Sequence, residues 1–304
     1  MQTDPAAPPG GNGHPPLAPV VFVTGKGGVG KTTVAAGLAM AAAEADGGAV
    51  FVEFGDGSAG KRALGVKPRS LSHVAIRPDQ AVLSAAAPLF GSATLAKLAL
   101  GNFAMRPLIQ AAPAVRELAV LELTRQVAAK HRGRRVVIDM PATGHSIAWL
   151  RVAQQGRDLT GSGPVHDLCD RLIQELLQPG RASIVVVTLP ERLVLHETLS
   201  LCRALERRVG LPVDRLVVNR VPSMPSARAV SDARRLAARD DAIGVAARRL
   251  SELLTVRQSV WSQVVDSLNE SVGQGTNGLT LLPQAAADPA ATTVAEWLRE
   301  GGAA

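Results

Sequence analysis

A glycine-rich stretch near the N-terminus carries residue types that bind phosphate. Residues 24–33 have the sequence TGKGGVGKTT, which fits the spacing G-x-x-x-x-G-K-[ST]. Glycines let successive backbone N–H groups turn toward phosphate oxygens, while Lys31 would reach the β- and γ-phosphates and Thr32 would ligate Mg²⁺. A glycine-rich turn without a ligand is the alternative. The predicted nucleotide-binding residues are Gly25, Lys26, Gly27, Gly28, Val29, Gly30, Lys31, Thr32 and Thr33.

The same stretch lies between a predicted strand and a predicted helix. Residues 20–24 (VVFVT) form an apolar run that ends at a glycine, and residues 31–45 (KTTVAAGLAMAAAEA) favour a helix. A phosphate-binding loop requires this strand–loop–helix context. The positive end of the helix would add to the attraction for phosphate.

A second residue that could take part in chemistry is Asp139. It ends the apolar stretch VVID within RRVVIDMP, residues 134–141. A carboxylate at the end of a strand beside a phosphate loop can hold Mg²⁺ through water, as a Walker B aspartate does. Asp139 could instead cap the following helix. The next residues, MPATGH (140–145), predict a flexible turn near the γ-phosphate.

The remaining apolar runs predict further strands, and together these form the sheet that positions these side chains. Residues 49–54 (AVFVEF), 182–190 (ASIVVVTLP) and 214–222 (DRLVVNRVP) are further strands without polar alternation. Continuous apolar strands separated by helices indicate a doubly wound α/β domain with a mostly parallel sheet. Helical segments are expected at about 70–131 and 146–180, where they form a small helical layer. The arginine-rich stretch 223–260 predicts a solvated amphipathic helix pair.

Composition indicates one folded domain with short flanking segments. Hydrophobic residues make up 46% of the 304 residues, which is typical of a globular chain. We expect a disordered Pro/Gly-rich leader at 1–19, a domain at 20–285 and a C-terminal tail at 286–304. The apolar stretch 81–105 is broken by Pro88, Gly91, Lys97 and Gly101, so a soluble helical layer is favoured over a membrane span. These features predict a cytoplasmic protein.

Charge and cysteine content narrow the range of partners. The net charge of +7 would suit an anionic partner, but the basic residues are scattered and aromatic residues make up only 3%. Nucleic acid is therefore not the expected partner. Cys169 and Cys202 lie far apart in the sequence and form neither a disulfide framework nor a CxxC site. We expect two ordinary core residues and no zinc.

Several ordered segments resemble the ArsA-type ATPases, a family that includes arsenical-pump ATPases and targeting ATPases for tail-anchored membrane proteins. KGGVGKTT (26–33) is the deviant Walker A form, and DMPATGHSIAWL (139–150) resembles the family's switch II. The segments APAVRELAVLEL (112–123), VTLPERLVLHET (187–198), VVNRVP (217–222) and LLP (281–283) are similar to later family motifs in the same order. The resemblance covers about residues 20–285 and implies a P-loop NTPase fold.

The resemblance implies two catalytic residues. Lys26 matches the signature lysine, which reaches across a dimer interface to the neighbour's nucleotide; a solvent-exposed lysine beside the phosphates is the alternative. Asp56 matches the switch I aspartate, which orients the attacking water. Here the family's D-P-A is replaced by Asp56-Gly57-Ser58, so Glu53 could take part of this role, or Asp56 could be a surface turn residue.

The resemblance also implies how the base is bound. Asn219 matches the residue whose amide pairs with adenine, with a strand-end cap as the alternative. Pro283 belongs to the late proline loop beside the base. The implied ligands are ATP as substrate and Mg²⁺, with Thr32 as a direct ligand and Asp139 acting through water.

Other parts of the known family patterns are missing. The chain has no CxxC zinc motif, no cluster of thiolates for arsenite, and no long Met-rich insertion after switch II. We therefore expect a Mg-dependent dimeric ATPase, as a homodimer or with a related chain, that couples its nucleotide state to an unidentified partner protein. The alternative is a ParA/MinD-like positioning ATPase that binds DNA or membrane in its ATP state. Residues 223–260 keep the DNA version open, whereas the non-basic C-terminus argues against the membrane version.

Overall fold

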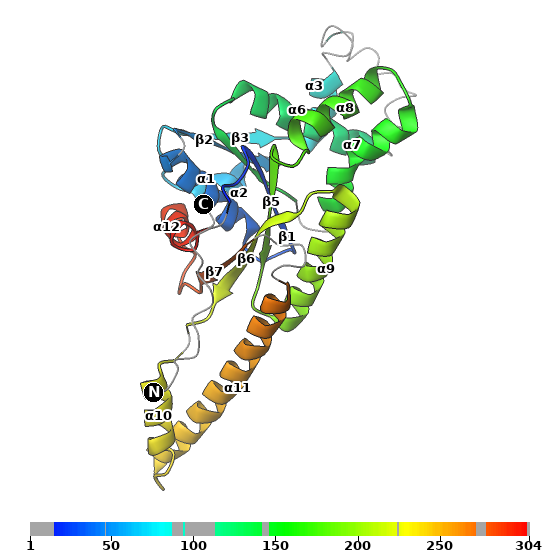
Figure 1. Ribbon diagram of the computed structural model, residues 1–304. Helices are drawn as coiled ribbons and strands as arrows, with labels where there is room; N and C mark the ends of the chain where they lie inside the picture. Colours follow the sequence, from blue (N-terminus) through cyan, green and yellow to red (C-terminus); the bar gives the residue numbers. More distant parts are fainter. Residues whose placement is uncertain are drawn as a thin grey trace.

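A computed structural model describes residues 15–45, 47–86, 94, 113–141, 146–223, 225–271 and 278–302. In these residues seven strands form one parallel sheet in the order β3-β2-β4-β1-β5-β6-β7 (Figure 1). The predicted doubly wound α/β fold is therefore confirmed. The strands are β1 (Val20–Gly25), β2 (Ala49–Phe54), β3 (Leu71–Ile76), β4 (Arg135–Asp139), β5 (Ala182–Thr188), β6 (Val213–Val221) and β7 (Leu279–Pro283).

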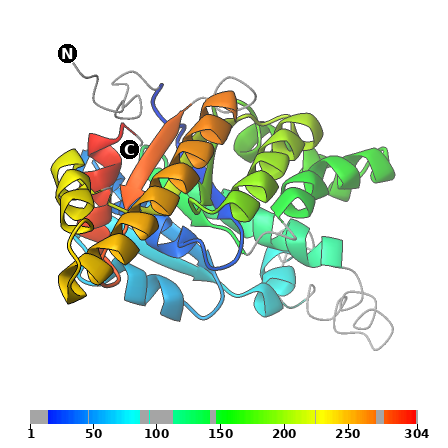
Figure 2. The same cartoon turned by 90° about the horizontal axis from the view of Figure 1, so that it is seen from below.

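Helices cover both faces of the sheet (Figures 1 and 2). One face packs against α1 (Lys31–Ala45), α2 (Ser58–Leu64) and α12 (Ala291–Glu300). The other face packs against α3 (Pro78–Ala86), α6 (Pro113–Lys130), α7 (Ser146–Thr160), α8 (Pro164–Leu176), α9 (Arg192–Val209) and the end of α11 (Ala242–Ser271). Successive strand residues point to opposite faces. Because both faces are covered, the central strands are apolar at almost every position.

Helix α1, which follows the glycine-rich loop, is buried on nearly all sides. Its residues from Val34 to Ala43 are all buried between the sheet and α12. A Cβ atom on Gly37 would overlap the side chain of Val294, so this glycine allows the two helices to approach closely. Residues 286–304 were expected to form a tail, but Ala291–Glu300 form α12, whose apolar face completes this core.

Two strands were missed in the sequence. The segment 70–131 was predicted to be helical, but it begins with β3. This edge strand, LSHVAI, is only partly buried, so it lacks the continuous apolar run that marked the other strands. The tripeptide at 281–283, expected as a loop, lies within β7. Most of 81–105 lies outside the described residues, and none of the helices described is long and apolar enough to cross a membrane.

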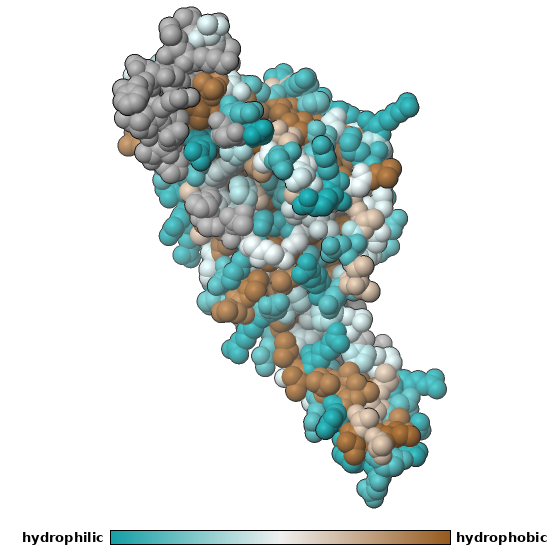
Figure 3. Space-filling model, turned by 180° about the vertical axis from the view of Figure 1, so that it is seen from behind, coloured by the Kyte–Doolittle hydropathy of each residue, from teal (hydrophilic) through white to brown (hydrophobic). Residues whose placement is uncertain are grey.

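The predicted arginine-rich helix pair is confirmed as α10 (Ala227–Leu236) and α11. The pair projects away from the sheet, and α11 returns to the body, where Val264 and Leu268 are buried (Figure 1). The helix runs to Ser271, beyond the predicted limit of 260. Apolar surface is visible on the projecting part (Figure 3), where Leu253 and Val256 are exposed.

The expected leader lies mostly outside the described residues. Its last residues pack on the domain: Leu17 is buried, and the Ala18 N–H donates to the Ser183 hydroxyl at 2.9 Å. The Pro15 carbonyl accepts from the buried Arg215 guanidinium at 2.5 Å. Both cysteines are buried on helices of the core, as expected.

Candidate functional site

The glycine-rich loop connects β1 to α1 at the edge where the parallel strands end, which is the usual ligand-binding edge of such sheets. Gly25 and Gly30 have φ values of +147° and +93°, which disfavour a side chain. A Cβ atom on Gly25 would overlap the Val187 carbonyl oxygen, and one on Gly30 would overlap the Asn219 amide. The loop therefore needs glycine at both ends, and its backbone is free to face a ligand.

Lys31, at the first position of α1, is buried and turned into this loop. Its ammonium group donates a hydrogen bond to the Lys26 carbonyl oxygen at 3.0 Å. Burial lowers the pKa of Lys31, and the charge of Asp139 partly opposes this effect. A buried ammonium group with a single carbonyl partner is poorly compensated, and a phosphate group is the ligand that would compensate it.

Thr32 and Asp139 come together across neighbouring elements. The Thr32 hydroxyl donates to Asp139 Oδ2 at 2.6 Å, while Asp139 Oδ1 is buried without a hydrogen-bond partner among the described residues. Burial raises the pKa of Asp139 to about 6, with the Thr32 hydrogen bond and the Lys31 charge opposing this shift. A hydroxyl and an orphaned carboxylate oxygen fit Mg²⁺ and its bound water. Thr32 and Asp139, which were predicted as the two magnesium-binding residues, therefore lie side by side.

A pocket of about 250 Å³ joins the loop to two distant segments predicted to bind the base. Gly30, Thr33, Asn219 and Pro283 all line it. The Asn219 amide donates to the Val29 carbonyl at 2.9 Å, and its oxygen accepts from the Arg220 N–H at 2.9 Å. One amide hydrogen of Asn219 remains available for a ligand.

Three further polar residues of this pocket were missed in the sequence. Arg220, Gln284 and Asp288 line it together with the predicted residues. Arg220 has a φ of 59°, which is uncommon for a residue other than glycine. It lies where the register between β6 and β7 shifts. This irregularity has no signature in the sequence, because residues 214–222 form an ordinary apolar strand pattern.

Two acidic residues near the end of β2 have different surroundings. Glu53 is buried, accepts from the Gly60 N–H at 2.9 and 3.0 Å with its two oxygens, and lies 2.7 Å from His73 Nε2. Asp56 is exposed and accepts from the Ser58 N–H at 2.9 Å, which lowers its pKa. Glu53 thus holds α2 and β3 in place, whereas the Asp56 carboxylate faces solvent.

Lys26 has a partner that was not predicted. Its ammonium group forms an ion pair with the carboxylate of Glu197 on α9, and the two side chains are 46% and 48% exposed. The adjacent Thr198 is buried and hydrogen-bonded to Thr188 at 2.9 Å, which fixes this part of α9 against β5. The segment VTLPERLVLHET and Lys26 were both singled out in the sequence, but the contact between them was not predicted.

A second unpredicted contact joins the loop to the segment after Asp139. The Thr24 hydroxyl donates to the Ser146 hydroxyl at 2.8 Å, and both residues are buried. Ser146 begins α7, directly after the turn predicted at 140–145. Residues 142–145 of that turn lie outside the described residues.

The sequence around this site is similar to that of known ATPases. Residues 18–161 match the family model described as anion-transporting ATPase (ArsA). ATPase BagA of Mycobacterium tuberculosis (strain H37Rv) and "Putative ATPase Mb3704" of Mycobacterium bovis are each 27% identical to the chain over 219 residues. Each alignment covers 66% of this chain and 64% of the relative, which is less than two thirds of the relatives' length.

Proposed function

We propose that this chain, which belongs to the ArsA-type ATPase family over residues 18–161, binds ATP with Mg²⁺ and hydrolyses it to ADP and phosphate. The observation that carries the proposal is the hydrogen bond between Thr32 and Asp139 beside a glycine loop that encloses Lys31. A hydroxyl, a carboxylate and an ammonium group beside one loop are the groups that phosphoryl transfer needs, and their proximity supports the proposal.

The loop residues bind the phosphates. Lys31 exchanges its bond to the Lys26 carbonyl for the β- and γ-phosphate oxygens, and the backbone N–H groups of the loop supply further donors. The pocket of about 250 Å³ beside Gly30 takes the base, with the remaining Asn219 amide hydrogen as donor and Pro283 against the ring.

Thr32 and Asp139 hold the metal. Mg²⁺ supplies charge neutralisation at the phosphates when bound. The Thr32 hydroxyl would be its direct protein ligand, and Asp139 would hold it through water, which would give the orphaned Oδ1 a hydrogen-bond donor. Asp56 orients the attacking water. The contacts of Glu53 to Gly60 and His73 are typical of a residue that supports α2 and β3, which favours Asp56 over Glu53 for this role.

Lys26 acts on the nucleotide of a second chain, in a homodimer or a dimer with a related ATPase. Its half-exposed ammonium group lies at the surface, where another chain can approach it. A positive charge brought to the neighbour's phosphates stabilises the charge that develops in the transition state. The nucleotide state then controls binding of a partner protein, and we place this cycle in the cytoplasm.

The DNA-binding alternative has weaker support. It needs a continuous basic surface, and the arginine-rich pair α10–α11 is the candidate. On α10, however, Arg228 and Arg235 both pair with Asp232, so part of the arginine charge is compensated within the helix.

Isothermal titration with Mg·ATP tests the proposal. Lys31→Ala should abolish measurable binding, because a neutral side chain leaves the phosphates without their buried positive charge. Lys61→Ala, at an exposed position on α2, is the matched control and should bind normally. Thr32→Ala should keep nucleotide affinity in EDTA but lose the increase produced by Mg²⁺. Unchanged Mg·ATP affinity in Lys31→Ala would contradict the assignment of this loop.

A further inference from the structure

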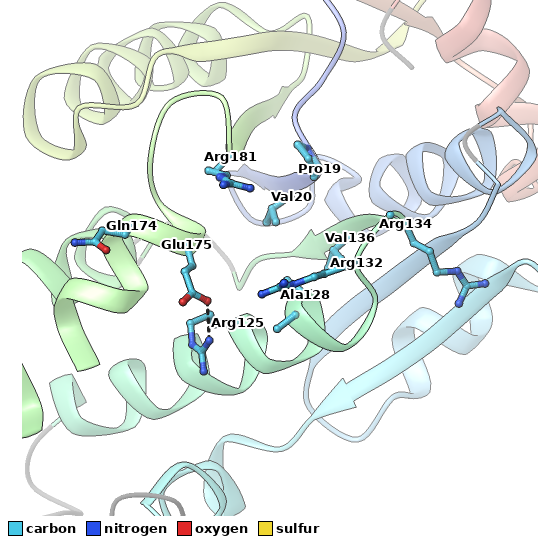
Figure 4. Close-up of a pocket in the computed structure, with 12 residues that line it drawn as sticks. Pro19, Val20, Arg125, Ala128, Arg132, Arg134, Val136, Gln174, Glu175 and Arg181 are labelled. Carbon is cyan, nitrogen blue, oxygen red and sulfur yellow. Dashed lines mark hydrogen bonds and ion pairs between the residues drawn. The ribbon is translucent and has the colours of Figure 1, made fainter. Parts of the chain in front are cut away.

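A second cavity, of about 460 Å³, lies at the edge of the sheet opposite the glycine-rich loop (Figure 4). Val20, at the start of β1, and Val136, near the start of β4, form its floor. The walls come from the end of α6, the end of α8 and the residue before β5. Since strands rise about 3.3 Å per residue, roughly 15–20 Å of β1 separates this cavity from the loop. The two sites are therefore distinct.

Four arginines line the cavity, and two of them already have partners that fix them. The Arg125 guanidinium donates to both Glu122 oxygens at 2.8 Å and to Glu175 at 2.7 Å, so its charge is neutralised. Arg134 donates to the Ser70 carbonyl and the Ser72 hydroxyl at 2.7 and 3.2 Å, so its guanidinium faces the edge of the sheet. Both guanidinium groups are therefore already engaged within the protein and are not the expected contacts of a ligand.

The other two arginines, Arg132 and Arg181, carry positive charges that no described partner compensates. Both are exposed, and neither side chain has a hydrogen bond or ion pair within the part of the chain that the structure describes. Figure 4 shows their side chains extending from opposite sides of the gap, Arg132 from the α6 side and Arg181 from the β5 side. Two guanidinium groups that line one cavity repel each other, and an oxyanion between them relieves the repulsion and accepts hydrogen bonds from both.

A neighbouring histidine responds to the positive charge at this edge. Burial lowers the pKa of His131, and the charges of Arg134 and Lys130 lower it further. Glu122 and Glu175 both pair with Arg125, so these three groups keep one net negative charge, against the three positive charges of Arg132, Arg134 and Arg181. The electrostatic potential at the cavity therefore favours a negatively charged ligand.

The floor of the cavity offers apolar surface and no free backbone donor. The Val20 N–H donates to the Arg181 carbonyl at 3.2 Å, and the Val136 N–H donates to the Pro19 carbonyl at 2.8 Å. Val20 and Val136 are themselves buried, so the accessible apolar surface of the cavity comes from the exposed Pro19 and the partly exposed Ala128 and Ala129. Recognition must therefore combine the guanidinium groups with apolar contact.

We propose that this cavity binds a small organic anion, with its carboxylate or phosphate group between Arg132 and Arg181 and its apolar part against Pro19 and Ala128. Organic ligands bind in clefts of this size that combine apolar walls with a few placed polar groups. The site is independent of the proposed nucleotide chemistry, since it shares no residue with the loop.

Ligand-observed NMR with phenyl phosphate and benzoate tests the proposal. The titrations are run with saturating ADP and Mg²⁺, so that the glycine-rich loop does not bind the probe. Wild type should bind at least one probe at millimolar concentration, less tightly as NaCl is raised. The better probe shows whether phosphate or carboxylate is the natural group. Methyl phosphate should bind more weakly than phenyl phosphate, because it leaves the apolar floor uncovered.

The double variant Arg132→Gln/Arg181→Gln should lose roughly tenfold or more in affinity, because two charge-assisted hydrogen bonds are removed. Arg207→Gln, at an exposed position on α9, is the matched control and should bind as wild type. The single variant Arg181→Gln keeps the test valid if the double variant unfolds. Equal affinity of wild type and variants, or no binding of either probe to wild type, would overturn the proposal. So would arginine-dependent retention of an oligonucleotide without binding of the small anions.

Discussion

The ammonium group of Lys26 is paired with the carboxylate of Glu197 in the same chain. Both side chains are about half exposed, and ion pairs of this kind contribute only about 0–1 kcal/mol. The pair can therefore open at little cost. A second chain that recruits Lys26 to its nucleotide must compete with Glu197 for this one ammonium group.

Glu197→Gln should therefore increase ATP hydrolysis. With the carboxylate neutralised, Lys26 is free to reach the neighbouring chain, and the gain is limited to about fivefold by the small strength of an exposed pair. The measurement is steady-state hydrolysis over a range of protein concentrations. Glu206→Gln, an exposed position on the same helix, is the control and should leave the rate unchanged. A rate as low as that of Lys26→Ala would instead show that Glu197 positions Lys26 for catalysis.

Asp139 should make the stability of the nucleotide-free protein depend on pH. Its pKa is raised to about 6 by burial, whereas an aspartate in the unfolded chain titrates near 4. Between about pH 4 and about pH 6, the unfolded chain loses this proton more readily than the folded one, so stability falls as pH rises. Above about pH 6 the destabilisation is complete and amounts to about 3 kcal/mol.

Asp139→Asn removes this titration and should raise the free energy of unfolding by up to about 3 kcal/mol above pH 7, with little effect near pH 4. Urea unfolding in EDTA across this range provides the measurement. Asp240→Asn, at an exposed position, serves as the control variant. An equal gain at both ends of the range would mean that the buried charge is not the cause.

Substitutions at Glu53 and Asp56 should have different effects: the first should lower stability, and the second should slow hydrolysis. Glu53→Gln replaces a carboxylate oxygen that accepts from Gly60 by an amide group, so we expect a loss of about 1–3 kcal/mol in unfolding free energy. ATP binding should remain. Asp56→Asn keeps an oxygen acceptor for the Ser58 N–H and should leave stability unchanged while hydrolysis slows. Urea unfolding and phosphate release measure the two effects. Slower hydrolysis in Glu53→Gln alone, with Asp56→Asn active, would exchange the roles.

The grouping of residues in the candidate nucleotide site could be predicted because these residues follow a local pattern. The loop, Asp139 and Asn219 each stand at the end of a strongly apolar strand, and parallel strands bring such ends to one edge. The contact between Thr32 and Asp139 then follows from the adjacency of β1 and β4. The loop motif, which requires an acidic residue on a neighbouring strand, was therefore sufficient to predict that residues 107 positions apart lie together.

Features that depend on long-range packing were not predicted. Edge strand β3 is half polar because neighbouring elements bury little of it, and α12 was missed because its partner, α1, lies at the other end of the sequence. The pair of Lys26 and Glu197 joins two surface residues without any shared pattern. The cavity with Arg132 and Arg181 likewise forms only when the beginnings of β1 and β4 are covered by α6 and α8.

A mixing experiment tests whether Lys26 acts on the neighbouring chain. Lys26→Ala should bind ATP, because Lys31 and the loop backbone remain, but it should hydrolyse ATP poorly. A charge supplied in this way is worth roughly 10³–10⁵ in rate for an arginine, and a lysine can give less. Lys31→Ala should fail to bind ATP. Each variant alone should therefore be inactive.

In a mixed dimer, the Lys26→Ala subunit keeps an intact loop and receives Lys26 from the Lys31→Ala subunit. One working site per mixed dimer should reappear, giving hydrolysis that neither variant shows alone. Differently tagged chains, purified through both tags, establish that subunits have exchanged. No recovery in mixed dimers shown to close would mean that Lys26 acts within its own chain. If the natural partner is a related chain, one substitution is placed in this chain and the other at the matching lysine of the related chain. Hydrolysis should again return only at the site whose loop is intact and whose neighbour still carries Lys26 or its counterpart.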